Sequence, residues 1–323
     1  MRMNMDWRQA QVSSVEEIAQ DVRKVEFNIE GLLPTFDPGS HTNVVVMIEG
    51  QRAVRTYTCI PAAPGRLAIA VKRHANSRGG SRFIWSLNPG DHVEMTVPEN
   101  RFELSWRAGH YLLIAGGIGV TPIYGMAKTL AGSAQSLRMV YGANSLAAMP
   151  FRAELQELLG DKLAVFPADQ DMFIDLDAEI AVLPDDAELY VCGPIGMLNA
   201  VKEAWAKARR PVSRLRYEVF GDNGKFAETS FEVSVANKGV TVQVRPDQSL
   251  LDALIGAGVE MIYDCQRGEC GLCAVKILEL EHAVVDHRDV FFSEEEKRES
   301  RNMCSCVSRL TAGRAVIDVG YRL

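Results

Sequence analysis

The cysteine spacing near the end of the chain limits its fold more than any other feature. Three cysteines follow a C-x4-C-x2-C pattern and a close pair comes later: Cys265, Cys270, Cys273, and then Cys304 and Cys306. Thiolates at this spacing, with one distant fourth, hold plant-type 2Fe-2S clusters. Gly268 and Gly271 stand between the first three, where a tight loop needs unusual φ angles and aims its N–H groups at the sulfurs. The pattern therefore predicts an iron–sulfur site.

The cysteine spacing leaves open which metal is bound and which cysteine is the fourth ligand. A structural zinc ion would also accept four thiolates, those of Cys270, Cys273, Cys304 and Cys306. That alternative leaves Cys265 and its glycine-containing loop without a role. For a cluster, the length of the connection allows either Cys304 or Cys306 to be the fourth ligand.

Length and composition set broad bounds. With 323 residues the chain is too long for one ordinary domain, so two or three are expected. A hydrophobic share of 47% and a charged share of 24% indicate a folded globular protein. The net charge of −7 argues against nucleic-acid binding and suits a basic protein partner. Without a long apolar run or a signal peptide, we expect no membrane association and a cytoplasmic protein with reduced cysteines.

Residues 1–107 alternate short strands with turns, and one helix is expected at 81–87. The expected strands are Val22–Ile29, His41–Ile48, Val54–Cys59, Leu67–Val71 and His92–Val97. Strands of this length and frequency predict a small antiparallel β-barrel.

Residues 108–220 alternate apolar strands with helical stretches, two of them at 151–159 and 196–208. The expected strands are Tyr111–Ala115, Leu137–Tyr141, Leu163–Phe166, Leu189–Cys192 and Leu215–Phe220. This alternation predicts a doubly wound parallel α/β domain, in which a nucleotide binds at the carboxyl ends of the strands.

The last part of the chain follows a polar, glycine-containing linker at 221–228. Residues 229–323 begin with a hairpin, Phe231–Val235 and Val240–Val244. A capped helix at 249–257 and the cysteine loop come next. The sequence thus predicts a third, small domain around the metal site.

Three segments of the first domain suit a phosphorylated flavin. They are Arg55-Thr56-Tyr57-Thr58 at the end of one strand, Ala70-Val71-Lys72 at the end of another, and Gly79-Gly80-Ser81 at the start of the helix. Arginine offers a bidentate fork to phosphate, tyrosine offers a flat face, and glycines at a helix start expose N–H groups to an anion. The first segment alone would be an ordinary exposed strand, but the three together predict a flavin site.

The second domain carries a dinucleotide signal. An apolar strand runs into a glycine turn and then a helix, with Gly116, Gly117, Gly119 and Thr121-Pro122 at the junction. Such a turn presents backbone amides and a helix start to a pyrophosphate. Together with Cys192-Gly193-Pro194 after a later strand, it predicts dinucleotide binding. The end of the next strand, 142–145, is uncharged and leaves NADH or NADPH open.

The C-terminal segments carry a family resemblance. Asp286-His287-Arg288-Asp289, Ser293-Glu294-Glu295-Glu296 and Cys306-Val307-Ser308-Arg309 resemble the ferredoxin module of the phthalate dioxygenase reductase and vanillate demethylase reductase family. In that family the cysteine of the C-x-S-R run is the last cluster ligand, which implies Cys306. This chain differs in carrying Cys304 as well. The resemblance covers the whole chain and implies a β-grasp fold for the module.

The resemblance also implies roles in the flavin domain, although this chain has Thr58 where the family motif ends in serine. Arg55 and residues 79–81 would hold the flavin phosphate, while Tyr57, Thr58 and Lys72 would border the ring or the ribityl chain. We find no loop for an adenine between residues 97 and 106, so FMN is favoured over FAD.

Near the nicotinamide the resemblance implies Cys192, Gly193 and Pro194, with Thr121 close to the flavin and Phe220 at its outer face. Cys192 could instead be a small buried apolar residue, and Phe220 could instead belong to the core. The family favours NADH over NADPH.

The function implied is electron transfer from NADH through FMN and a 2Fe-2S cluster to a Rieske-type oxygenase. The flavin is the converter between two-electron hydride and one-electron cluster chemistry. Alternatives are a redox-sensing or zinc-stabilised binding module without turnover, and a flavin reductase that serves small acceptors. We expect a monomer.

Overall fold

The computed structural model describes residues 6–31, 33–63, 65–73, 79–133, 135–219 and 226–320. The predicted site residue Phe220 and the linker positions 221–225 lie outside the described residues. The chain divides into two compact units, residues 5–220 and, with the first four residues, 221–323. Each unit is described on its own.

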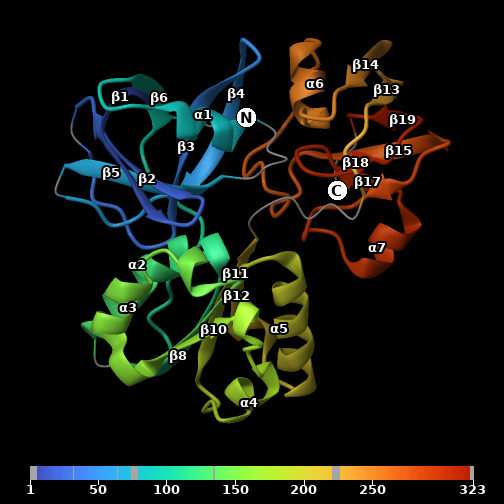
Figure 1. Ribbon diagram of the computed structural model, residues 1–323. Coiled ribbons are helices and arrows are strands. Elements are labelled where there is room, and N and C mark those ends of the chain that lie inside the picture. The colour runs from blue at the N-terminus through green and yellow to red at the C-terminus, as the bar shows by residue number, and fades with distance from the viewer. Residues whose placement is uncertain are drawn as a thin grey trace. The chain divides into compact units, whose positions relative to one another are not determined.

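The first part of the larger unit is an antiparallel sheet in the order β4-β3-β6-β1-β2-β5, with β7 paired to β3 (Figure 1). Its strands are β1 (Trp7–Ala19), β2 (Val22–Ile29), β3 (Ser40–Ile48), β4 (Gln51–Thr58), β5 (Arg66–Lys72), β6 (His92–Thr96) and β7 (Glu99–Asn100). A bridge between Ile60, just after β4, and Ala68 in β5 links the two ends of this order. Alternating side chains such as Phe27, Ile69 and Met95 fill its core, as the strand period requires.

The second part of the larger unit is a parallel sheet in the order β10-β9-β8-β11-β12. Its strands are β8 (His110–Gly116), β9 (Ser136–Ala143), β10 (Leu163–Pro167), β11 (Glu188–Gly193) and β12 (Leu215–Val219). The strands β8 and β11 are buried almost throughout, which is typical of parallel strands covered on both faces. The doubly wound α/β domain predicted from the sequence is therefore present.

Helices cover this sheet in two pairs. The first pair is α2 (Val120–Ala131) with α3 (Arg152–Leu159), and the second pair is α4 (Leu176–Ala181) with α5 (Ile195–Lys207) (Figure 1). Short 3-10 turns complete the unit: η1 (Gly117–Gly119), η2 (Leu146–Ala148), η3 (Gly160–Lys162), η4 (Ala168–Gln170) and η5 (Val212–Arg214). No helix in the described part of the chain is long and apolar enough to cross a membrane.

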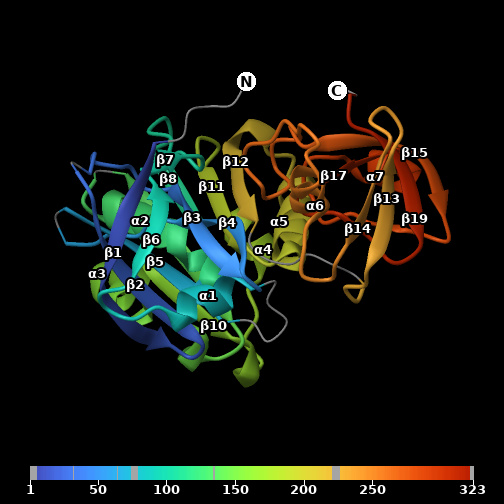
Figure 2. The same cartoon turned by 90° about the horizontal axis from the view of Figure 1, so that it is seen from above.

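The smaller unit is a mixed sheet in the order β14-β13-β19-β15-β17, with a separate β16–β18 pair; β13, β14, β15 and β19 lie side by side in Figure 2. Its elements are β13 (Phe231–Val235), β14 (Val240–Val244), α6 (Leu250–Gly256), β15 (Ala274–Glu281), β16 (Val285–Asp286), α7 (Glu294–Glu299), β17 (Asn302–Cys304), β18 (Arg309–Leu310) and β19 (Arg314–Asp318). The Ser249 hydroxyl caps α6, and Ser293 with Glu296 forms a capping box on α7. The hairpin, helix and cysteine loop follow in the predicted order.

Candidate functional site

The four predicted cluster ligands lie together as two pairs in the smaller unit. Cys265 hydrogen-bonds to Cys270, and Cys273 hydrogen-bonds to Cys306. Electrostatic interactions of Cys270 with Cys273 and of Cys306 with Cys265 connect the pairs. Because a 2Fe-2S cluster takes two thiolates on each iron, this pairing suits it. Among the described residues, no three His, Cys, Asp or Glu side chains gather as ligands of a single metal ion.

Backbone amides of the loop point at these sulfurs, as its glycines predict. Arg267 N lies 3.4 Å from Cys265 Sγ, and the Gly268 amide donates to Cys306. Gly268 has φ +75°, and a Cβ at this position would lie 2.6 Å from Val307 Cγ2. A larger residue would therefore open the loop and withdraw amides that stabilise negative charge on the sulfurs.

Hydrogen bonding favours the thiolate form at Cys270 and Cys273 and the neutral thiol form at their partners Cys265 and Cys306. The thiols of Cys304 and Cys306 hold the pKa of Cys273 well below its ordinary value, and Cys265 does the same for the pKa of Cys270. Thiolate is the form of cysteine that binds metals. A hydrogen bond to Cys273, together with burial, raises the pKa of both Cys304 and Cys306. Cys306 also interacts electrostatically with Cys265.

A buried polar network around Asp289 is hydrogen-bonded to the cysteine loop. Asp289 accepts hydrogen bonds from Ser308 Oγ at 2.9 Å and from Phe292 N at 3.0 Å. Burial raises the pKa of Asp289, but these bonds and one with His287 outweigh it, so the pKa lies below its ordinary value. Val290 N donates to Gly268 O at 3.0 Å, which ties this segment to the cysteine loop.

In the larger unit, Arg55 lies against the start of α1 (Gly80–Ser86). A Cβ on Gly80 would be 2.8 Å from Arg55 Cγ and 3.3 Å from its Nε. Gly79 has φ +89°, and a Cβ there would come within 2.7 Å of Ile48. The two glycines therefore let a guanidinium-bearing side chain approach the backbone at a helix start, an arrangement that fits a phosphate.

Trp85 fixes α1 in this position. Its Nε1 donates to Val71 O at 3.0 Å in β5. The guanidinium carbons of Arg23 and Arg73 lie 4.9 Å and 4.5 Å from the centre of its ring. These contacts tie the helix that carries the glycines to the strand that carries Lys72.

The other predicted flavin residues have varied environments. Thr56 Oγ1 donates to Asn43 Oδ1 at 2.7 Å. Three predicted residues are buried and four are half-buried: Thr58, Ala70 and Val71, and then Thr56, Tyr57, Lys72 and Ser81. The half-buried set leaves surface that a ring or ribityl chain can contact.

Thr58 lies next to a buried pair of ionisable residues that the sequence did not predict. Its Oγ1 lies 3.3 Å from Nε2 of His41 in β3, and that nitrogen lies 2.6 Å from Oε1 of Glu218 in β12. Both ionisable side chains are only 2% exposed. The pair therefore joins the antiparallel sheet to the parallel sheet within the larger unit, directly beside a predicted flavin residue.

We expect Glu218→Ala to destabilise the larger unit by about 3–5 kcal/mol, because removing one partner of a buried pair leaves the other uncompensated. Urea unfolding followed by flavin fluorescence measures this loss. Asp177→Ala is the matched control, since the pair of Asp177 with Lys207 is solvent-exposed and should contribute less than about 1 kcal/mol. Equal shifts of the urea midpoint in the two variants would contradict the importance of the buried pair.

The glycine turn and the later Cys192-Gly193-Pro194 segment are in backbone contact. A Cβ on Gly119 would lie 2.3 Å from Cys192 O, and one on Gly116 would lie 2.7 Å from Pro194 Cδ. Gly117 has φ +53°, and its carbonyl accepts from the Tyr141 hydroxyl at 3.2 Å. The structure thus brings the two parts of the predicted dinucleotide site to one edge of the parallel sheet.

Two further predicted residues of this site are enclosed. Thr121 is buried and its Oγ1 donates to Ile118 O at 3.1 Å. Cys192 is fully buried within the apolar core, whereas Pro194 is exposed. The thiol of Cys192 therefore contributes to packing in this structure.

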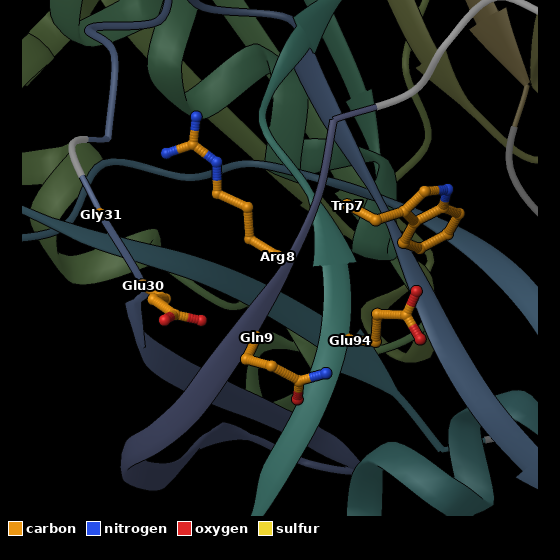
Figure 3. A pocket seen from close by; sticks show the side chains of 6 residues that line it. All are labelled: Trp7, Arg8, Gln9, Glu30, Gly31 and Glu94. Carbon is orange, nitrogen blue, oxygen red and sulfur yellow. The ribbon is translucent and has the colours of Figure 1, made fainter.

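A shallow pocket of about 520 Å³ lies elsewhere on the antiparallel sheet (Figure 3). It is lined by Trp7, Arg8, Gln9, Glu30, Gly31 and Glu94. Trp7 and Arg8 extend to opposite sides of β1 in Figure 3. None of the predicted site residues lines this pocket, and we assign it no role.

Comparison with protein families matches three domain models in sequence order. Residues 9–104 match an oxidoreductase FAD-binding domain, residues 113–203 an oxidoreductase NAD-binding domain, and residues 233–311 a 2Fe-2S iron–sulfur cluster binding domain. The fold and the three sites define an NADH-dependent iron–sulfur flavoprotein reductase.

Relatives that match over nearly the whole chain identify the family of the protein. Phthalate dioxygenase reductase of Burkholderia cepacia is 32% identical over 95% of this chain and 96% of its own. Vanillate O-demethylase oxidoreductase of a Pseudomonas species is 32% identical over 95% and 98%. A solved phthalate dioxygenase reductase structure has a TM-score of 0.82 at 30% identity, over 97% of this chain and 98% of its own. The chain belongs to the phthalate dioxygenase reductase and vanillate demethylase reductase family.

Another relative is named for a different acceptor. Tetrachlorobenzoquinone reductase of Sphingobium chlorophenolicum is 33% identical over 95% of this chain and 97% of its own.

Proposed function

We propose that this chain passes electrons from NADH to a Rieske-type oxygenase and that its flavin is FMN. A bound flavin converts a two-electron hydride into single electrons, which a bound 2Fe-2S cluster carries one at a time. The observation that carries the proposal is the pairing of Cys265 with Cys270 and of Cys273 with Cys306 on a chain that also has flavin and dinucleotide domains.

The assignment of residues is part of the proposal. Arg55 and Gly79 to Ser81 bind the flavin phosphate, and Thr58 lies beside the ring with His41 and Glu218 behind it. The glycines of 116–119 face the pyrophosphate, with Cys192 to Pro194 near the nicotinamide and Phe220 at the flavin face. Cys265, Cys270, Cys273 and Cys306 hold the cluster.

We propose three domains in the chain. The flavin domain spans residues 1–107, the dinucleotide domain 108–220 and the cluster domain 229–323. We also propose that the protein acts as a monomer.

The connection from β5 to α1 supports FMN. FAD carries an adenosine beyond the same phosphate, and the adenine needs a surface to stack on. Residues 73–79, which lead into the phosphate-binding start of α1, contain no Phe, Tyr or Trp. We therefore expect chromatography of the flavin released from the purified protein to show FMN; release of FAD alone would overturn this part of the proposal.

The oxygenase partner is tested by anaerobic mixing. Protein reduced with NADH is combined with purified Rieske-type oxygenases, including phthalate dioxygenase, and reduction of the oxygenase cluster is followed by its absorbance. We expect electron transfer to at least one of them. Reduction of small acceptors alone would contradict the partner class, while the internal path from NADH to the cluster would remain.

A second candidate is direct reduction of a quinone, which the relatedness to tetrachlorobenzoquinone reductase favours. A quinone accepts electrons from the flavin without help from the cluster. Loss of the cluster would then leave quinone reduction unchanged, whereas it would abolish transfer to a Rieske-type oxygenase.

A further inference from the structure

We propose that Cys304 is not a ligand but donates a hydrogen bond to the ligand Cys273 and thereby raises the reduction potential of the cluster. The inference rests on the proposed function, because it takes Cys306 as the fourth ligand.

The strand geometry directs the Cys304 side chain toward the ligands. Cys304 ends β17 and pairs with Ala274 in β15, the residue after Cys273. The preceding residue, Met303, packs in the main core of the unit. Side chains alternate along a strand, so Cys304 points the other way. It lies there in a small cluster with both Cys273 and Cys306.

Backbone contacts fix Cys304 beside Cys273. Ser305 donates to Cys273 O twice, from its N at 3.2 Å and from its Oγ at 2.8 Å. Ser308 N donates to Cys304 O at 2.9 Å. The two cysteines therefore keep their relative positions, and their side chains are hydrogen-bonded to each other.

Cys306 has the contacts expected of a ligand, whereas those of Cys304 suit a donor. Cys306 receives the Gly268 amide and interacts with Cys265 in the opposite pair. Cys304 is completely buried. A cysteine that binds no metal carries an S–H group, which is a weak donor, and the sulfur of the neighbouring ligand Cys273 is an acceptor within the same buried cluster.

A hydrogen bond to a ligand sulfur changes the two redox states of a cluster unequally. The reduced cluster carries one more negative charge, so a donor stabilises it more than the oxidised cluster. Hydrogen bonds to the sulfurs are among the features that set the reduction potential of these clusters. Removing the donor should therefore lower the potential.

The test compares Cys304→Ala with Cys304→Ser, two variants that differ by one hydroxyl in the same site. Iron and sulfide are assayed, and the cluster potential is measured by a dye-mediated titration followed by electron paramagnetic resonance. We expect both variants to bind iron and sulfide as the unaltered protein does. The potential should fall in Cys304→Ala and stay near the original value in Cys304→Ser.

Two results would overturn the inference: loss of iron from Cys304→Ala, which would make Cys304 a ligand, or an unchanged potential in that variant. If the alanine variant does not fold, Cys304→Val fills the space without a donor and replaces it. Absence of a cluster from the unaltered protein would instead contradict the proposed function, so the two failures are distinguishable.

Discussion

Cys265→Ala should reduce the NADH-dependent transfer of electrons to cytochrome c to background. Cys265 is the buried partner of Cys270, and its loss leaves one iron of a 2Fe-2S cluster with a single thiolate. The proposed flavin and dinucleotide residues lie in the other compact unit. We therefore expect the rate of flavin reduction by NADH to be unchanged.

Flavin reduction by NADH and electron transfer to cytochrome c are measured as two separate rates. Stopped-flow absorbance follows flavin reduction, and steady-state absorbance follows cytochrome c. The control is Cys59→Ala, because Cys59 is a buried cysteine in the antiparallel sheet domain to which no site role is assigned. Undiminished cytochrome c reduction in Cys265→Ala would show that the cluster does not lie on the electron path.

Arg55→Ala should weaken FMN binding at least about 100-fold, since a hydrogen bond to a charged group contributes about 1.5–3 kcal/mol and a bidentate arginine makes two. The Arg55 side chain packs directly on Gly80 at the start of α1, where the phosphate is proposed to bind. Fluorescence titration of flavin-free protein with FMN measures the dissociation constant.

Two further variants test whether the loss of affinity comes from the bidentate guanidinium group of Arg55. Arg55→Lys should bind with intermediate affinity, because lysine keeps the charge but loses the bidentate fork. Arg66→Ala is the control, since Arg66 lies in the same sheet and makes an exposed ion pair with Glu26 at 3.4 Å. If all three variants bound FMN equally well, the phosphate site would have to lie elsewhere.

The parts of the site that depend on local spacing were predictable from the sequence. The C-x4-C-x2-C loop requires glycine between its ligands, and Gly268 does have φ +75° with its amide on a sulfur. The strand-to-helix turn at Gly116 and Gly119 likewise follows from the short-range pattern of an apolar strand before glycines. In both cases neighbouring residues determine the geometry.

The first strand was missed because its pattern is irregular. β1 (Trp7–Ala19) is the longest strand of its sheet, yet it carries few buried side chains and has register shifts at Val12/Ser14 and Glu17/Ala19. Bulges of this kind break the alternation on which a strand prediction depends.

The pair of His41 and Glu218 was missed for a different reason. The two residues are far apart in the chain and meet only when the two sheets pack together. In the sequence His41 stands beside the polar residues Thr42 and Asn43, and Glu218 follows Arg216 by two positions, so neither residue is marked as buried by its neighbours. Similarly, the spacing of Cys304 and Cys306 could not rank them as ligands; the proposal of Cys306 draws on its contacts with Gly268 and Cys265, which only the folded chain brings about.

The central claim, one electron path through three groups on a single chain, is tested most directly by anaerobic absorbance spectroscopy of the purified protein before and after NADH, with iron and acid-labile sulfide assayed on the same sample. We predict overlapping flavin and 2Fe-2S bands that both bleach with NADH, and two irons and two sulfides for each flavin. A protein that contains zinc and shows no visible bands, or one in which only the flavin bleaches, would contradict the account.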